Sequence, residues 1–244
     1  MAGHMRGPID NGRLDAVSAL VRSIMPQHTV YAEPWFREGE IFFKKHPSRR
    51  EVLNDPDERI VNFYTTVRTR WNELMFLLEG TLHSESLSNL ADNIYFGRKK
   101  MDDLYRAWAV WLRYSRDRVN RNAWLVDTSA WLAGGREESV LGGKVNKALA
   151  ERLYNVLLVN HTVPDFLVET DSEETFFYIR PTDRKEAMAL TNILPVLKGK
   201  FTFYYPDKRI AENVANACGL NKVTDDTDVT VYTNFKIQKT LFDK

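Results

Sequence analysis

The sequence lacks several features that would assign it to a specialised class of protein. It has one cysteine, Cys218, so no disulfide can form within the chain, which fits a reducing compartment. No apolar run approaches the roughly 18 residues that a membrane span requires. The five histidines are scattered without the spacing of metal ligands, at His4, His28, His46, His83 and His161. We therefore expect no disulfide framework, no membrane span and no metal centre.

Charge of one sign is also scarce. The 34 Lys and Arg residues balance 33 Asp and Glu, leaving a formal net charge of +1. No basic field extends over the whole chain, so any contact with nucleic acid must come from a local cluster of cations. The 43% hydrophobic and 27% charged residues over 244 positions are ordinary for one globular core with an insertion. We expect a cytoplasmic protein that is bacterial or phage-encoded.

Apolar, β-rich segments alternate with segments of helical periodicity, which is typical of an α/β protein. Between residues 81 and 149 the sequence becomes helical and basic. The pattern predicts two parts of one α/β core, 1–80 and 150–244, with an inserted helical lobe at 81–149. Strands are expected at 29–34, 51–55, 154–160, 175–179, 200–205 and 228–235, and helices at 13–26, 56–78, 102–121, 183–197 and 208–218.

Several segments resemble, in the right order, the D12 class of adenine-specific DNA methyltransferases, the family of Dam. They include "YAEPWFREGEIFFKK", "EVLNDPDERIVNFYTTVR", "SEETFFYIRP" and "VTVYTNFKIQKTLFD", and the resemblance spans nearly the whole chain. It implies a mostly parallel, seven-stranded, Rossmann-like methyltransferase sheet with a helical target-recognition insertion. It also implies S-adenosylmethionine as methyl donor and an adenine that is flipped out of the duplex and methylated at N6.

The family's glycine-rich donor loop, which lets backbone approach the donor, is altered in this chain. Glu33, Pro34 and Gly39 match the family pattern, as do Phe42 and Phe43. Charged side chains replace two glycines of the family pattern, and a tryptophan replaces its aromatic residue, at Arg37, Glu38 and Trp35. These bulky replacements stand where the donor would need close contact with the backbone.

Four other positions correspond to donor-binding residues of the family. Gly12 and Arg13 stand where the family has a Gly-Lys pair whose lysine lines the donor pocket. Asp55 matches the acid that holds the ribose hydroxyls, and Thr162 stands where an Asp lies near the donor's adenine. Asp55 could instead start a helix, and Glu33 could pair locally. We expect no cofactor, or S-adenosylmethionine if the donor pocket is retained.

The family's catalytic Asp-Pro-Pro-Tyr is replaced by Arg180-Pro181-Thr182-Asp183. In the family, the acid and a carbonyl accept hydrogen bonds from the adenine amine, and the tyrosine stacks on the base. Arginine cannot accept a hydrogen bond, and its charge would repel the donor's sulfonium by roughly 4 kcal/mol at about 4 Å. Losing one such electrostatic group costs ~10²-fold to ~10³-fold in rate. Asp183 could replace the acceptor only if the turn were rebuilt.

A basic run lies inside the expected lobe. Its cations are Arg98, Lys99, Lys100, Arg106, Arg113, Arg116, Arg118 and Arg121, against Asp102, Asp103 and Asp117. Contact with nucleic-acid phosphates is one use of such a run, and a solvated helix face is the other. The tryptophans in and after the run, at 108, 111, 124 and 131, are expected in the core, with base stacking as the alternative. Cys218 is expected to be buried.

These observations leave three hypotheses. The first is a methyltransferase relative that has lost methyl transfer and binds DNA or a protein partner, such as an active methyltransferase subunit. The second is an active adenine-N6 methyltransferase with a divergent site. The third is a scaffold or interaction protein of a phage or mobile element.

Overall fold

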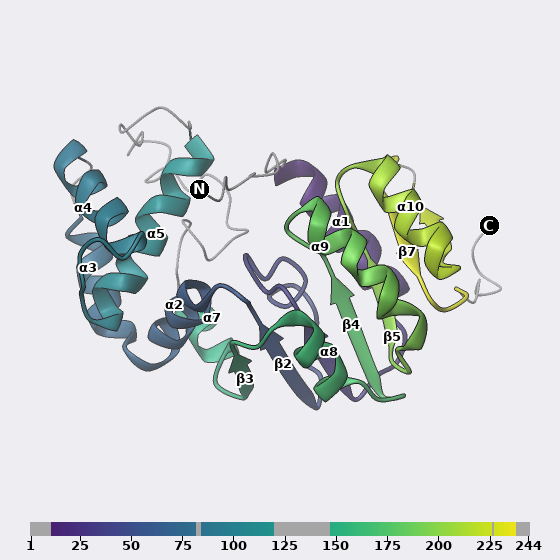
Figure 1. Ribbon diagram of the computed structural model, residues 1–244. Coiled ribbons are helices and arrows are strands. Elements are labelled where there is room, and N and C mark those ends of the chain that lie inside the picture. Colours follow the sequence, from purple (N-terminus) through teal and green to yellow (C-terminus); the bar gives the residue numbers. More distant parts are fainter. Residues whose placement is uncertain (1–10, 82–83, 120–146, 226, 238–244) are drawn as a thin grey trace. The chain divides into compact units, whose positions relative to one another are not determined.

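The computed structural model describes residues 11–81, 84–119, 147–225 and 227–237 of the chain, and it has an α/β architecture (Figure 1). Seven strands form one mixed, mostly parallel sheet in the order β3-β2-β1-β4-β5-β7-β6. Strand β1 runs parallel to β2 and β4, and β4 runs parallel to β5. Strand β7 is antiparallel to both of its neighbours, β5 and β6. A Rossmann-like α/β fold, as the sequence predicted, is consistent with this sheet.

The central strands are short and almost completely buried. Their bounds are β1 Val30–Glu33, β2 Arg50–Asn54, β4 Thr175–Ile179 and β5 Lys200–Phe203. All five residues of β4 are buried, which fits a parallel strand covered on both faces. The flanking strands are β3 Val156–Val159, β6 Asn221–Thr224 and β7 Thr230–Thr233.

The chain divides into two compact units. The first comprises Met1–Trp35, Lys44–Pro56 and His161–Lys244, and the second comprises Phe36–Phe43 and Asp57–Asn160. The helices of the first unit are α1 Asn11–Ile24, α8 Val163–Thr170, α9 Arg184–Ala189 and α10 Lys208–Cys218. Those of the second are α2 Glu58–Thr69, α3 Trp71–Glu79, α4 Glu85–Tyr95, α5 Asp103–Val119 and α7 Lys147–Arg152. Both expected lobe boundaries, 81 and 149, fall inside the second unit.

The first unit carries an unusually polar sheet face. Because side chains alternate along a strand, Tyr31 and Glu33 of β1 share a face, and the register places Tyr31 opposite Glu51 of β2. Lys45 forms a buried ion pair with Glu51, and its Nζ lies 4.3 Å from the centre of the Tyr31 ring. The neighbouring Lys44 Nζ donates to Asp15 Oδ1 of α1 at 2.8 Å. A buried ion pair therefore lies beside Tyr31, toward the amino ends of β1 and β2.

Two expected helices are divided in the structure. The helix predicted at 56–78 is two helices, α2 and α3, separated at Arg70, whose ψ of 39° is not helical. Pro56 precedes the cap instead of occupying the first turn, and Asp57 caps α2 by accepting from the Arg59 amide. The helix predicted at 183–197 ends as α9 at Ala189 and continues as two short 3₁₀ turns, η1 Leu190–Asn192 and η2 Leu194–Val196. Pro195 lacks the amide proton that a longer helix needs.

Three other expectations were wrong in detail. Strand β6 was not expected, because its four residues are largely exposed and carry no buried alternation. Cys218 is partly exposed at the last residue of α10 instead of buried. Asp55 does not start a helix, since α2 is capped by Asp57. The helices and strands at the remaining expected positions are confirmed, and within the described residues no helix is long and apolar enough to cross a membrane.

Candidate functional site

The candidate site of the first unit lies where the sheet changes direction. The chain passes from β1 outward to β2, and the strand on the other side of β1 is β4, so β1 and β4 flank a topological switch point. In open α/β sheets, ligands bind outside the carboxyl ends of the strands at this point. The residues that follow β1, β2 and β4 are therefore the ones to examine.

Glu33 ends β1 and is completely buried. Its Oε1 accepts a hydrogen bond of 2.6 Å from the Tyr31 hydroxyl, which is buried as well. The expectation that Glu33 pairs locally is thus confirmed. A carboxylate in such a place needs polar partners to remain charged, and the tyrosine supplies one of them.

Asn54, the last residue of β2, joins three parts of the site, and sequence reasoning missed it. Its side-chain Nδ2 donates to the Pro34 carbonyl at 2.9 Å and to the His161 carbonyl at 3.2 Å, and its Oδ1 accepts from the His161 amide at 2.8 Å. Asn54 therefore fixes the segment after β1 and the segment before α8 against the end of β2. A polar residue that ends an apolar strand was the available signal. Asp55, the next residue, is also buried.

Thr162 is the N-cap of α8. Its Oγ1 accepts from the Asp165 amide at 3.3 Å and donates to the Asp165 carboxylate at 2.5 Å. The residue is exposed, unlike Glu33 and Asp55. Its interactions are those of a helix cap.

The loop 36–43 belongs to the second unit, where aromatic side chains hold it. The Phe36 ring lies 4.5 Å from that of Tyr64 on α2, and the Tyr64 hydroxyl donates to the Arg37 carbonyl at 2.7 Å. Gly39 has a φ of +65°, and a Cβ there would come within 2.6 Å of the Phe36 ring. Arg37 has a φ of 45°, a conformation that favours glycine. Its guanidinium lies 3.7 Å from the Glu38 carboxylate.

The turn after β4 is occupied by helix-capping interactions. Asp183 is the N-cap of α9, and its Oδ1 accepts from the Glu186 amide at 2.8 Å. Glu186 Oε2 in turn accepts from the Thr182 amide at 2.8 Å and from the Thr182 hydroxyl at 2.5 Å. This reciprocal arrangement is a variant of the capping box. Arg180 and Pro181, which precede it, are buried.

Three acidic side chains lie near the Tyr205 hydroxyl beside this turn. Burial raises the pKa of the Tyr205 hydroxyl, and the nearby charges of Asp183, Asp207 and Glu186 raise it further. An additional negative charge is therefore unfavourable beside the turn. The backbone of the same region is fixed because the Tyr204 amide donates to the Ile179 carbonyl at 3.0 Å.

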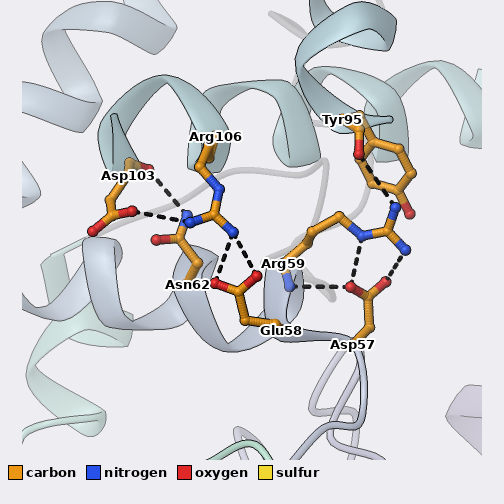
Figure 2. Close-up of polar contacts among 7 residues, drawn as sticks. All are labelled: Asp57, Glu58, Arg59, Asn62, Tyr95, Asp103 and Arg106. Carbon is orange, nitrogen blue, oxygen red and sulfur yellow. Dashed lines mark hydrogen bonds and ion pairs between the residues drawn. The ribbon is translucent and has the colours of Figure 1, made fainter. Parts of the chain in front are cut away.

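Two arginines of the basic run in the second unit form ion pairs with acidic side chains of the same unit. Figure 2 shows Arg106 of α5 between Glu58 of α2 and Asp103, at 2.6 Å and 3.1 Å. Arg113 is mostly buried and pairs with Asp92 of α4 at 2.9 Å. These two arginines join helices, so the solvated-face interpretation of the run does not hold for Arg113.

Three consecutive cations of the run are exposed among the described residues. Arg98, Lys99 and Lys100 are exposed. Trp108 and Trp111 are at most 3% exposed, which confirms their core role and excludes base stacking by their rings. Seven of the residues predicted above have side chains that lie outside the described residues. They are Gly12 and Arg13 in α1, Arg116 and Arg118 in α5, and Arg121, Trp124 and Trp131.

The described residues contain no group of three or more His, Cys, Asp and Glu side chains that could hold a metal ion. No protein-family model and no curated protein matches the chain.

Proposed function

We propose that this chain is a relative of the adenine-specific DNA methyltransferases that has lost methyl transfer and acts by binding, to nucleic acid or to a protein partner. The sheet supports the fold part of the proposal. Its order 3-2-1-4-5 is the usual doubly wound one, and an antiparallel β7 completes seven strands between β5 and β6. Buried Glu33 and Asp55 stand at the ends of β1 and β2, where the resemblance expects the donor.

The capped turn after β4 carries the proposal. A methyltransferase of this class needs an acidic acceptor, a free carbonyl and a stacking ring at this turn. Here, Asp183 Oδ1 accepts from the Glu186 amide, and the Thr182 hydroxyl donates to the Glu186 carboxylate. These groups hold α9 in place. Buried Arg180 stands at the position of the family's acid and cannot accept a hydrogen bond from an adenine amine. The side chains of Thr182, Asp183 and Glu186 therefore serve to cap α9, which supports a loss of methyl transfer.

Transfer of a radiolabelled methyl group from S-adenosylmethionine to DNA tests the loss of activity. We expect no incorporation into duplex or single-stranded DNA above the level without protein, while an active adenine methyltransferase labels the same DNA. Incorporation that Asp183→Asn abolishes would contradict the proposal, because asparagine keeps the helix cap and removes only the carboxylate.

Titration calorimetry with S-adenosylmethionine separates the donor pocket from the chemistry. Heat of binding without methyl transfer supports a retained pocket in an inactive protein. Absence of both supports a scaffold that acts only through its surface.

A further inference from the structure

A row of alternating cations and aromatic rings crosses the second unit, formed by Arg59, Tyr95, Arg113, Phe96 and Arg98. We name it the cation–aromatic ladder. The Arg59 and Arg113 guanidinium groups lie 4.0 Å and 4.7 Å from the centre of the Tyr95 ring. The Arg113 and Arg98 groups lie 4.8 Å and 5.3 Å from the centre of the Phe96 ring. The two rings meet edge to face, with centres 5.2 Å apart.

The inner part of the ladder comprises Arg59, Tyr95 and Arg113. Acidic side chains hold its two arginines in place and neutralise their charges. Arg59 donates two hydrogen bonds to the Asp57 carboxylate, at 2.6 Å and 2.7 Å, and one to the Tyr95 carbonyl at 3.3 Å (Figure 2). Arg113 pairs with Asp92. These cations are already used in holding α2, α4 and α5 together, so they are not available to a ligand.

The outer end of the ladder is exposed. The Phe96 side chain is 45% exposed, and Arg98, Lys99 and Lys100 follow it on the surface. Within the described residues, none of these three cations forms an ion pair with an acidic side chain. The chain turns at Gly97, which has a φ of +70°, and the Lys99 amide donates to the Asn93 carbonyl at 3.0 Å. The outer end combines an exposed ring with three cations that have no acidic partner among the residues that the structure describes.

We propose that the outer end of the ladder binds single-stranded nucleic acid, with an unpaired base stacked on Phe96 and the phosphates contacted by Arg98, Lys99 and Lys100. This inference rests on the nucleic-acid form of the proposed function and names the kind of nucleic acid. A base that stacks on Phe96 takes the place of the Arg98 guanidinium, which lies over that ring and, being exposed, can move to stack on the outer face of the base. Stacking on aromatic rings together with phosphate contacts is how single strands are held without sequence preference.

The exposed ring favours a single strand over the other anionic partners. In a duplex the base faces are covered by neighbouring base pairs, so only the cations would contribute to binding. An acidic peptide would also use the cations, but its carboxylates would gain nothing from the Phe96 ring. Only an unstacked base uses both the ring and the cations.

The test is fluorescence anisotropy of the full chain with a labelled single-stranded oligonucleotide and with the matching duplex. Phe96→Leu keeps an apolar side chain and removes the aromatic face, and we expect it to weaken single-strand binding about 10-fold. Duplex binding should stay unchanged. The matched control is Phe76→Leu, because Phe76 on α3 is 83% exposed and has no ring or cation contact among the described residues.

The cations are tested by salt dependence. Replacing Arg98, Lys99 and Lys100 together with Ala should reduce the slope of log affinity against log salt by about 2 for the single strand, since each phosphate contact contributes about 0.7. Thermal unfolding of every variant is measured in parallel. Because the replaced side chains are exposed, melting temperatures should stay within the scatter of the wild type.

The outcomes separate this inference from the proposed function. No binding of the wild type to either nucleic acid at low salt removes both the nucleic-acid form of the proposed function and this inference. Binding that Phe96→Leu leaves unchanged, or weakens equally for duplex and single strand, overturns only the inference. Tighter binding to poly-glutamate than to the oligonucleotide overturns it in favour of an acidic protein partner.

Discussion

At the scale of single residues, Asp183 in the turn after β4 has a structural role as the N-cap of α9. Asp183 is the only acid of the segment 180–183, and its carboxylate accepts from the Glu186 amide, one of the first-turn amides that lack an acceptor within a helix. Glu186 completes the arrangement from inside the helix by accepting from Thr182. The chemistry of the segment is therefore structural, and its stability effect can be measured directly.

Replacing Asp183 with Ala should lower the free energy of unfolding by about 1 kcal/mol, because the N-cap hydrogen bond of α9 is lost. Asp183→Asn should lower the free energy of unfolding by a few tenths of a kcal/mol or not at all, because the side-chain amide oxygen accepts the same hydrogen bond. Urea denaturation of the three proteins measures both differences. Equal losses for Ala and Asn would show that the carboxylate charge, and not the cap, is what the residue contributes.

At the scale of elements, a buried ion pair joins β2 to the segment that precedes it, next to Tyr31 of β1. The Lys45 ammonium reaches the Glu51 carboxylate and the Ser48 hydroxyl, and Glu51 Oε1 accepts from the Ser48 amide at 3.0 Å. Both side chains of the ion pair are almost completely buried. The pair ties the segment before β2 to the strand itself.

Lys45→Met should lower the free energy of unfolding by about 3–5 kcal/mol, because it leaves the Glu51 charge buried without its ammonium partner. The double variant Lys45→Met with Glu51→Leu should recover most of this loss, since two apolar side chains of similar volume leave no charge behind. Chemical denaturation of both single variants and the double variant gives the coupling energy. Additive losses would mean that the two residues stabilise the protein independently.

At the scale of the whole molecule, the dependence of stability on pH follows from groups with shifted pKa values. Burial lowers the pKa of His28 by more than the hydrogen bond to the Pro26 carbonyl raises it, and the Lys45 charge, which lowers the pKa, and the Glu51 charge, which raises it, contribute less. Burial raises the pKa of Tyr205 and of Tyr232, with nearby carboxylates adding to the effect. The acid and alkaline limits of stability are therefore set by different parts of the first unit.

The histidine and the two tyrosines change the stability of the protein at opposite ends of the pH range. His28 is protonated more readily in the unfolded chain, so stability is complete above pH 6.5 and falls as the pH drops below it. The two tyrosines keep their protons longer in the folded protein, so stability falls as the pH rises above about 10. The greatest stability is expected between these limits.

Thermal unfolding across pH 5.5 to 11 should show both losses. His28→Asn should weaken the acid loss below pH 6.5, since asparagine can still donate to the Pro26 carbonyl but does not titrate. An imidazole pKa at or above 6.5 in an NMR titration would contradict the assignment.

The sequence by itself determined the alternation of strands and helices, because hydrophobic periodicity and proline and glycine positions act locally. The end of a buried strand indicated the turn at 180–183, and the resemblance to the methyltransferase family indicated Glu33 and Asp55. It missed β6, whose exposed residues have no buried face to mark them.

The tertiary structure decided what those residues contact. No local pattern states that Asn54 would join Pro34 to His161, more than 100 residues away in sequence, or that Arg113 would pair with Asp92 while Arg98 stays exposed. Which cations are neutralised and which face the solvent depends on how α2, α4 and α5 pack. A sequence lists charges in order, whereas only the fold brings distant ones within hydrogen-bonding distance.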